Sequence, residues 1–360
     1  MPNQAQPLKV AVIGAGYWGP NLARNFSTSP LWDLVAICDL DTERAEALAV
    51  KVGHPAVVPS VSQLLADFEI DAVAIATPAR THHPIAMQAL SAGKHVLVEK
   101  PLADRGSAGQ ELVDTAEDLG LVLMADHTYC YTPAVTKIRD LIASGDLGEI
   151  LYIDSVRINL GLIQPDVDVF WDLAPHDLSI LDFILPDGLR PLTVTAQSAD
   201  PLGAGKACVG YLSMPLPGGA LAHIHVNWLS PTKIRSMVIG GSKRTLVWDD
   251  LNPQQRLSIY DRGVDLRGQE LVNGDSQDRR NASVSYRLGD TWSPALEEFE
   301  PLARMVSQFH ASIQEEAVSP TDGRAAMRVL SVLEATSRSL ERGGRRARVM
   351  GEELRLEVAK

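Results

Sequence analysis

KVAVIGAGYWGP, residues 9–20, is the stretch that decides the fold of this chain. The apolar run up to Gly14 predicts a buried β-strand, and the segment after Gly19 has the pattern of a helix with Pro20 in its first turn. Between them, Gly14, Gly16 and Gly19 form a GxGxxG motif. Glycines in such a turn let the backbone approach a pyrophosphate, which the helix N-terminus then holds. The stretch therefore predicts the first strand, turn and helix of a dinucleotide-binding domain.

Asp39 supports this interpretation, because it ends the next predicted strand 20 residues after Gly19. An acidic group there can accept a hydrogen bond from a ribose 2′-hydroxyl, and its charge repels a 2′-phosphate. No arginine follows Asp39 directly, so we expect NAD rather than NADP. Tyr17 and Trp18, inside the motif, are expected at the cofactor, although Trp18 could instead pack the first helix onto the sheet. The alternative is an ordinary glycine turn followed by an ordinary strand-end aspartate.

Length, composition and charge narrow the remaining possibilities. The chain has 360 residues, of which 45% are hydrophobic and 22% charged, which is typical of a globular protein of two domains. Its net charge of -12 and pI of about 5.2 disfavour nucleic acid and membrane surfaces as partners. The first residues lack the pattern of a signal peptide, and the three cysteines are far apart. We therefore expect a cytoplasmic protein.

Up to residue 127, short apolar strands alternate with helical segments. Continuous apolar strands separated by helices are typical of a parallel sheet that is covered on both faces. The pattern predicts a doubly wound α/β Rossmann domain over residues 1–127. The expected strands are 9–14, 33–39, 71–78, 95–101 and 121–127, and the expected helices include 42–52 and 84–93.

After residue 127 the pattern changes, and residues 128–360 are expected to form a second, substrate-binding domain. Many alternating strands with few helices between them predict an α+β domain with a large, mostly antiparallel, open sheet. Its C-terminal helix could pack back on the first domain. The expected helices are 133–145, 297–317 and 323–342; the expected strands begin with 149–160 and continue to 263, and a polar, glycine-rich loop is expected over 263–294.

Parallel strands present their carboxyl ends at one edge of a sheet, so the residues there should face the same cofactor crevice. Thr77 and Pro78 follow one strand, Glu99 and Lys100 end the next, and His127 ends the last. A lysine in this place can donate to a substrate oxygen and stabilise alkoxide character. The alternative for an isolated lysine is a solvated strand end.

A second group of candidates lies in FWDLAPHDLSILDFIL, residues 170–185. Asp172 and His176 are four residues apart and share one face if the helix begins early enough. If Pro175 is instead the first helical residue, their geometry is looser. An imidazole can accept or return an alcohol proton near neutral pH, and Asp172 can orient that ring or bind substrate. A helix-capping aspartate and a structural histidine remain open alternatives.

Several weaker candidates complete the set. Arg157 and Asn159 share one face of the strand 149–160 and could bind sugar hydroxyls or a phosphate, or simply cover an exposed sheet face. His82 begins a helix beyond Pro78 and could lie near the cofactor. His223 and His225 share a strand face without an evident carboxylate or cysteine partner, which favours a structural pair over a metal site. We expect no metal.

Taken in order, these motifs resemble the family of glucose–fructose oxidoreductase, inositol dehydrogenase and rhizopine-catabolism enzymes (Gfo/Idh/MocA). The resemblance rests on GxGxxG, the strand-end aspartate, the stretch ATPARTHHPIAMQALSAGKHVLVEKPL (76–102) and DLAPHD (172–177). It implies a Rossmann domain followed by a domain with a large open sheet, and catalytic roles for Lys100, Asp172 and His176 around the substrate. Other family members often have Asp-x-Gly-x-His with a second aspartate three positions later, whereas here Asp177 directly follows His176.

The resemblance also implies a chemistry. Segments such as GYWGPNLARNF and INLGLIQPDV are similar to a branch that acts on nucleotide sugars, aminocyclitols or aminoglycoside-like sugars. We therefore expect NAD-dependent hydride transfer at a secondary alcohol of a sugar, with carbon 3 as the expected position and no metal. Inositol, aminocyclitol or aminoglycoside oxidation is an alternative, and a non-catalytic NAD- or sugar-binding protein is an alternative of another class. By analogy, the open sheet could form a homodimer or tetramer.

Overall fold

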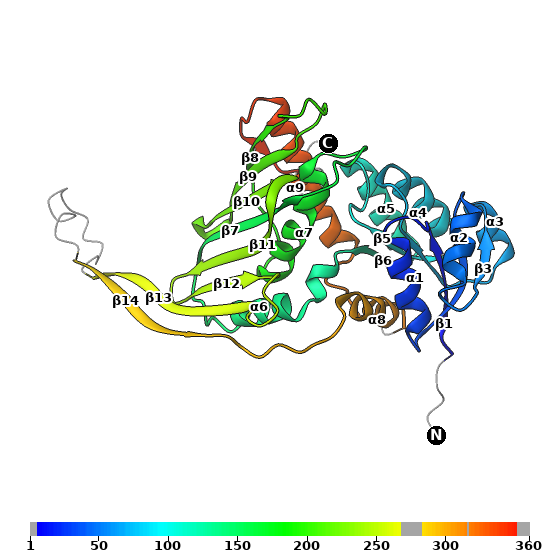
Figure 1. Cartoon of the computed structure of the whole chain (residues 1–360), viewed down its shortest axis with the longest axis horizontal. Helices are drawn as coiled ribbons and strands as arrows, with labels where there is room; N and C mark the ends of the chain where they lie inside the picture. The colour runs from blue at the N-terminus through cyan, green and yellow to red at the C-terminus, as the bar shows by residue number, and fades with distance from the viewer. Residues whose placement is uncertain (1–5, 268–282, 315–316, 351–360) are drawn as a thin grey trace, which may run out of the picture.

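A computed structural model describes residues 6–267, 283–314 and 317–350. Two sheets lie side by side and are joined by helices that contact both of them (Figure 1). The first sheet contains six described strands in the order β3-β2-β1-β4-β5-β6, and all of its strand pairs are parallel. This is the doubly wound arrangement that the sequence predicts. The strands are β1 (Leu8–Ile13), β2 (Trp32–Cys38), β3 (Ala56–Val58), β4 (Ala72–Ile75), β5 (His95–Glu99) and β6 (Leu123–Asp126).

Helices cover both faces of this sheet, because its strands are apolar on both sides. Val96, Leu97 and Val98 of β5 are all fully buried, with alternate side chains in two separate core clusters. The strand order reverses between β1 and β4, which opens a crevice at the carboxyl ends of the strands. The helices are α1 (Gly19–Thr28), α2 (Thr42–Ala49), α3 (Val61–Asp67), α4 (His82–Ser91) and α5 (Gly106–Asp118), and the turns η1 (Ala79–Thr81) and η2 (Thr128–Tyr131) are 3₁₀ helices.

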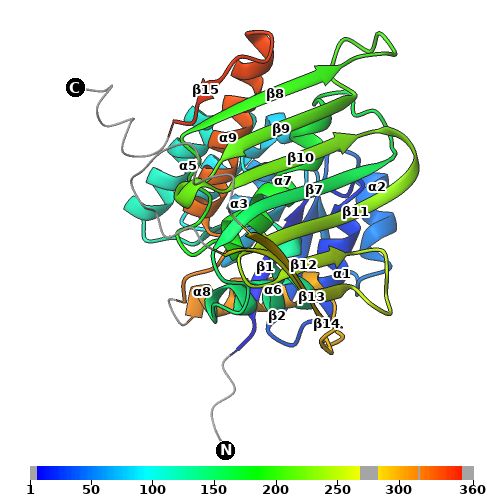
Figure 2. The same cartoon turned by 90° about the vertical axis from the view of Figure 1, so that its left-hand side faces the viewer.

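The second sheet has nine described strands in the order β14-β13-β12-β11-β7-β10-β9-β8-β15. Only the β7–β10 pair is parallel among these described strands, so the prediction of a mostly antiparallel sheet is confirmed. Figure 2 shows the strands in front of α7 and α9, which pack on the sheet's other face. The strands are β7 (Ile150–Leu160), β8 (Thr193–Ala199), β9 (Val209–Pro215), β10 (Leu221–Asn227), β11 (Leu229–Gly241), β12 (Thr245–Asp249), β13 (Leu257–Arg267), β14 (Ser283–Trp292) and β15 (Ala347–Arg348).

Three helices pack on this sheet, α6 (Pro133–Ala143), α7 (Val169–Ile184) and α9 (Gly323–Glu341), whereas α8 (Pro301–Gln314) packs on the first sheet. Helix α8 contacts strand β2, and α9 contacts helix α5. Phe309 of α8 stacks on Trp32 at 5.3 Å between ring centroids, and the Trp32 indole donates to the carbonyl of Val306. Glu334 of α9 accepts a 2.7 Å hydrogen bond from the Gly106 N–H at the start of α5. None of the helices in the described part of the chain is long and apolar enough to cross a membrane.

The expected loop over residues 263–294 is wrong in its described parts. Strands β13 and β14 pair antiparallel and form a ribbon that extends away from the helices (Figure 1). Val264 and Tyr286 face each other across the pair, and both side chains are exposed, as is Leu288. The ribbon thus lacks the buried face that gives a strand its apolar alternation, which explains why its sequence resembles a loop. Residues 268–282 of the expected loop lie outside the described residues.

Candidate active site

A cavity of about 1160 Å³ lies between the carboxyl ends of the first sheet and the α7 side of the second. Both sheets contribute to its wall, since it extends from the glycine turn after β1 to Arg235 in the middle of β11 and Asp250 just after β12. Most of the predicted site residues meet here. Those that line the cavity are Gly16, Tyr17, Trp18, Thr77, Pro78, Glu99, Lys100, Asn159, Asp172 and His176.

The glycine turn has the shape that a pyrophosphate requires. A Cβ added to Gly14 would lie 2.7 Å from the carbonyl oxygen of Ala76, and one added to Gly19 would overlap the carbonyl of Gly14. A Cβ on Gly16 would meet nothing within 4 Å. Gly14 and Gly19 therefore allow the turn to close, whereas the backbone at Gly16 lies open to a ligand. These residues fit a dinucleotide cofactor.

Asp39 lies beside this turn, as predicted. Its Oδ2 accepts a 2.6 Å hydrogen bond from the Ala15 N–H, and its Oδ1 accepts one of 2.9 Å from the Asp41 N–H. Oδ1 also receives Nη2 of Arg44 at 2.8 Å, an ion pair that the sequence analysis missed. Burial alone would raise the pKa of Asp39, but the bonds from Ala15, Arg44 and Asp41 lower it, so the carboxylate is charged.

Lys100 and Asp172 connect the end of β5 to helix α7. The Lys100 ammonium, at the end of β5, lies 2.9 Å from the carbonyl oxygen of Asp172 and 3.2 Å from its Oδ1. Trp228 donates its indole N–H to the other carboxylate oxygen, Oδ2, at 3.0 Å. The Asp172 carboxylate is thus held from both sides, and it holds the lysine in the cavity wall.

Helix α7 begins early enough to place Asp172 and His176 on one face. Asp168 caps the helix, because its Oδ1 accepts the Phe170 and Trp171 N–H groups at 2.9 and 3.0 Å. The helix then continues through Pro175 to Ile184. This decides the geometry that the sequence left open: Asp172 and His176 are one turn apart within a single helix.

His176 lines the cavity as a buried, uncharged imidazole. Its Nδ1 is buried and has no hydrogen-bond partner in the described parts of the chain. Burial lowers the pKa of His176 well below its ordinary value, and the positive charges of Lys100 and Arg157 lower it further. The ring of Tyr129 contacts the imidazole edge to face, with 5.2 Å between centroids. The imidazole is therefore uncharged at neutral pH.

Two carboxyl groups line the cavity side by side, because Glu99 and Asp126 are paired in register at the ends of β5 and β6. Burial and the neighbouring Asp126 raise the pKa of Glu99 to about 8, and burial also raises that of Asp126. Asp126 accepts hydrogen bonds from the Trp18 indole at 2.6 Å and from the Thr128 hydroxyl. Trp18 is therefore fastened across the ends of the strands.

The prediction that Arg157 binds substrate is corrected by its burial. Its side chain is 3% exposed, and it forms an ion pair with Asp177, with Nε 2.8 Å from Oδ2. Ser155 donates to the same carboxylate at 2.9 Å, and the guanidinium lies 4.5 Å from the centroid of the Tyr129 ring. Arg157 thus packs against the ring of Tyr129, which lines the cavity, and does not line the cavity itself. Asn159, on the same strand face but nearer its end, does line it.

Two histidines predicted at the cofactor are also corrected. His82 is 1% exposed, and its two ring nitrogens bridge the carbonyl oxygens of Pro101 and Thr77 at 2.7 and 2.8 Å. It therefore connects the loops that follow β4 and β5. His127 is 2% exposed and absent from the cavity wall, because its ring is turned inward. Burial lowers the pKa of His127 to about 3, which keeps it neutral.

The remaining cavity wall includes Tyr129, Arg235 and Arg256. Tyr129 accepts a 2.9 Å hydrogen bond from Arg235, whose guanidinium lies 3.6 Å from Asp250. Arg256 lines the same end of the cavity. These side chains come from η2, from the middle of β11 and from the connection between β12 and β13, so only the folded sheet brings them together. His223 and His225 lie elsewhere, stacked on Tyr211, and the described residues contain no metal-binding group of histidine, cysteine or carboxylate side chains.

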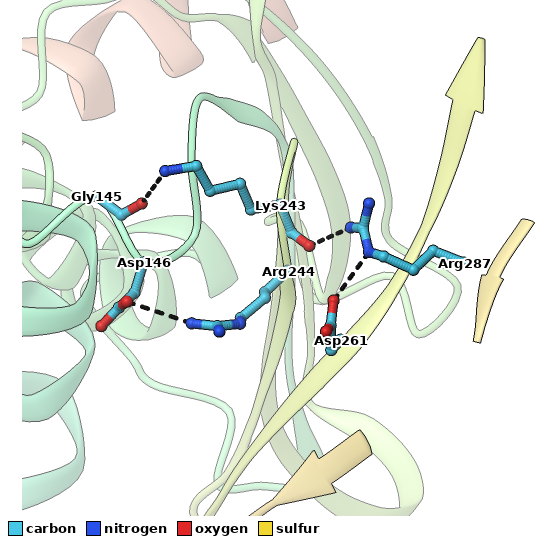
Figure 3. Close-up of a pocket in the computed structure, with 6 residues that line it drawn as sticks. All are labelled: Gly145, Asp146, Lys243, Arg244, Asp261 and Arg287. Carbon is cyan, nitrogen blue, oxygen red and sulfur yellow. Dashed lines mark hydrogen bonds and ion pairs between the residues drawn. The ribbon is translucent and has the colours of Figure 1, made fainter. Parts of the chain in front are cut away.

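A second, smaller hollow of about 360 Å³ lies at the base of the ribbon (Figure 3). Its charged groups bind one another. Arg244 pairs with Asp146 at 3.2 Å, Arg287 with Asp261 at 2.8 Å, and the Lys243 ammonium donates to the carbonyl of Gly145 at 3.1 Å. The hollow therefore fastens the ribbon and the β11–β12 turn to the end of α6.

Comparison with known proteins agrees with this geometry. The family model described as "Oxidoreductase family, NAD-binding Rossmann fold" matches residues 8–127, and the GFO/IDH/MocA C-terminal domain matches residues 135–247. The UDP-N-acetylglucosamine 3-dehydrogenase of Acidithiobacillus ferrooxidans is 30% identical over 297 residues, which cover 78% of this chain and 90% of that protein. Inositol 2-dehydrogenase of Rubrobacter xylanophilus is 28% identical over 236 residues, covering 64% and 67%.

Solved structures give the same result for the fold. A crystal form of the same UDP-N-acetylglucosamine 3-dehydrogenase aligns with a TM-score of 0.76 at 27% identity, covering 92% of this chain and 97% of that one. GenD2 from gentamicin A biosynthesis, in complex with NAD, aligns with a TM-score of 0.78 at 23% identity, covering 96% and 97%. The likeness extends over both sheets.

Proposed function

The chain belongs to the Gfo/Idh/MocA family of NAD-binding oxidoreductases, and from this premise we propose that it transfers hydride between nicotinamide and a secondary alcohol or ketone of a sugar. The observation that carries the proposal is the meeting of Lys100, Asp172 and His176 on one cavity that also contains the open glycine turn. An ammonium, a carboxylate and a neutral imidazole are the groups that alcohol oxidation needs.

Each of the three residues has a distinct part in this chemistry. Bound NAD supplies the hydride acceptor. Lys100 donates a hydrogen bond to the reacting oxygen and stabilises its negative charge as an alkoxide forms. His176, which is neutral at pH 7, accepts the alcohol proton in oxidation and returns it in reduction. Asp172, held by Lys100 and Trp228, keeps the lysine in place and positions the substrate.

We propose a nucleotide-activated or amino sugar as the substrate, oxidised at carbon 3. Two observations support this choice: relatives named for nucleotide-sugar and glucoside 3-dehydrogenases, and a cavity that extends past His176 to Arg235 and Arg256. Arginines at that end could bind a phosphate. An inositol, aminocyclitol or aminoglycoside is the alternative substrate, favoured by the relative named inositol 2-dehydrogenase.

Three further features are proposed with this function. The chain divides into an NAD-binding domain over 1–127 and a substrate domain over 128–360, because β6 ends at Asp126 and β7 begins at Ile150. The exposed face of the second sheet carries half-exposed aromatic side chains, Tyr152 and Tyr211, which suit a homo-oligomer interface. All three cysteines are free thiols, as a reducing cytoplasm allows.

A substrate panel tests the proposal. The purified protein is mixed with NAD or NADH and with nucleotide sugars, free inositols and aminoglycosides in turn, while NADH absorbance is followed in both directions. We expect turnover with nucleotide sugars. Turnover of free polyols alone would mean that the substrate is an inositol or another free polyol and not a nucleotide sugar. Tight NADH binding with no absorbance change for any compound would instead favour a non-catalytic sensor.

A further inference from the structure

His127 is a buried imidazole whose two ring nitrogens have no hydrogen-bond partner in the described parts of the chain. Its side chain is 2% exposed and does not belong to the cavity wall. A buried polar atom without a partner is costly and rare in folded proteins, and it usually binds an ordered water or has a function. Two such atoms in one ring make His127 a candidate functional residue.

The turn that follows His127 places it close to His176. His127 directly precedes η2, and the Tyr129 ring of η2 contacts the His176 ring with 5.2 Å between centroids. One residue further on, the Cys130 thiol donates to the carbonyl oxygen of Ser179 on α7 at 3.4 Å. The two imidazoles also interact electrostatically, since a positive charge on His127 lowers the pKa of His176. With Nδ1 of His176, the two rings hold three buried nitrogens that no described residue binds.

The two nitrogens of His176 have different surroundings. The ring lines the cavity and Nδ1 is buried, so Nε2 is the nitrogen that a substrate can reach. Because the ring is uncharged, one nitrogen carries a proton and the other a lone pair. Nε2 can accept a proton only if the ring already holds its own proton on Nδ1. A buried Nδ1–H in turn needs a hydrogen-bond acceptor.

The carboxylates in this part of the molecule do not supply that acceptor, because each of them pairs with a cation. The pairs are Asp172 with Lys100, Asp177 with Arg157 and Asp250 with Arg235. The three cations, which come from β5, β7 and β11, all lower the pKa of His176. An uncharged imidazole has one nitrogen that accepts a hydrogen bond, and that of His127 is used by no described residue.

We propose that His127 is a positioning residue, which accepts the Nδ1–H of His176 through a bridging water and so keeps the lone pair of Nε2 directed into the cavity. A single buried water can join two nitrogens that do not bond directly. The inference rests on the proposed function. In oxidation the hydroxyl proton moves to Nε2 while hydride leaves the same carbon for nicotinamide, and the imidazolium that forms keeps an acceptor for its Nδ1–H.

NMR of the cofactor-free protein with isotope-labelled histidine tests this inference, because nitrogen chemical shifts distinguish the two tautomers of an imidazole. The chain has nine histidines, and the signals of His176 are identified by their loss in His176→Gln. We expect wild-type His176 to hold its proton on Nδ1. In His127→Phe the proton should shift to Nε2, because Nδ1–H has lost its acceptor. His127→Gln, whose amide oxygen is an acceptor, should restore the wild-type tautomer.

Turnover gives a second readout, with a nucleotide sugar or polyol that the substrate panel finds active. In His127→Phe, kcat should fall about 10- to 100-fold, the scale of one buried hydrogen bond, while KM changes less than about three-fold because His127 does not line the cavity. His127→Gln should recover most of this loss. His83→Gln is the control, because it changes an imidazole that binds Glu111 outside the cavity, and it should alter neither kcat nor the His176 signals.

The outcomes separate this inference from the proposed function. An Nε2–H tautomer of His176 in wild type would overturn the inference, and so would an unchanged tautomer in His127→Phe. The expected tautomers in a protein that turns over no compound of the panel would support the hydrogen bond and contradict the proposed function. Melting curves of the variants verify that each one is folded.

Discussion

The hollow at the base of the ribbon and the cavity between the two sheets are both lined by lysine, arginine and aspartate side chains, yet these are arranged differently. In the hollow, Arg244 binds Asp146 and Arg287 binds Asp261, while Lys243 donates to a backbone carbonyl (Figure 3). These groups are partly exposed and satisfy one another, so their charges fasten the structure together.

In the cavity, the charges are held but not fully satisfied. Lys100 is tied to Asp172, yet its ammonium lines an open space that a substrate oxygen could enter. His176 has a buried Nδ1 with no partner among the described residues, and the pKa of Glu99 is raised to about 8. Shifted pKa values and incomplete pairing in a cavity are typical of reactive groups. The difference in pairing, and not the number of charges, separates the two regions.

The largest effect on stability is expected at the Arg157–Asp177 ion pair, which lies outside the cavity wall and is almost fully buried. Arg157→Met should lower the free energy of unfolding by about 3–5 kcal/mol, because it leaves the Asp177 carboxylate buried without its cation. Urea denaturation of the cofactor-free protein measures this loss. A decrease below about 1 kcal/mol would mean that Asp177 finds water or another donor, and the buried pair would then resemble those of the hollow.

Lys100→Met is expected to have the next largest effect. Turnover should fall roughly 100-fold or more, the scale of one lost electrostatic or acid–base group, while NADH affinity changes little. Lys243→Met is the matched control, because it removes a lysine that donates to a carbonyl in the hollow, and it should keep turnover within about two-fold of wild type. Near-normal turnover in Lys100→Met would show that the two lysines are equivalent, contrary to the proposed function.

The residues of the site differ in how far the sequence could predict them. The glycine turn, Asp39 and Lys100 were predictable, because strand periodicity places each of them at the same end of a parallel sheet. Asp172 and His176 were predictable as a pair only if the helix began early, and the deciding residue is the cap at Asp168. Here local rules and the final geometry agree.

Other residues were not predictable, because their roles depend on tertiary contacts. The alternation of β7 correctly places Arg157 and Asn159 on one face, but it does not reveal that Asp177 of α7 covers the first and leaves the second open. The ion pair between Arg44 and Asp39 depends on the turn between β2 and α2. The ribbon was missed because an exposed β-ribbon has no buried face to produce an apolar pattern.

Glu99 should give the cavity a pH dependence of stability. Burial raises its pKa from 4.5 to about 8, so between these values the folded protein holds a proton that the unfolded chain releases. Stability from this group is therefore complete at low pH and declines as pH rises toward 8, by at most about 1.4 kcal/mol per pH unit.

Glu99→Gln tests this directly, since it removes the titration while keeping the shape. Relative to wild type, this variant should become progressively more stable from about pH 4.5 to about pH 8, the window between the unfolded and folded pKa values, and level off above it. Thermal melts of the cofactor-free proteins measure the difference. Glu69→Gln is the control, because it changes an exposed carboxylate just before β4. Its stability should vary with pH in the same way as that of wild type. If the stability difference between Glu99→Gln and wild type did not change with pH, Glu99 would be an ordinary carboxylate without a raised pKa.

The smallest effect is expected in the hollow itself. Arg244→Met breaks the pair with Asp146 and the contact with the Trp292 ring, whose centroid lies 4.9 Å from the guanidinium carbon. Because both charged side chains are partly exposed, the free energy of unfolding should fall by about 1 kcal/mol or less, and the difference should shrink further in high salt. Urea denaturation at low and high salt gives both values. A loss above about 2 kcal/mol that salt does not reduce would mean that the hollow is as strongly coupled as the Arg157 pair, and burial would then no longer distinguish the two regions.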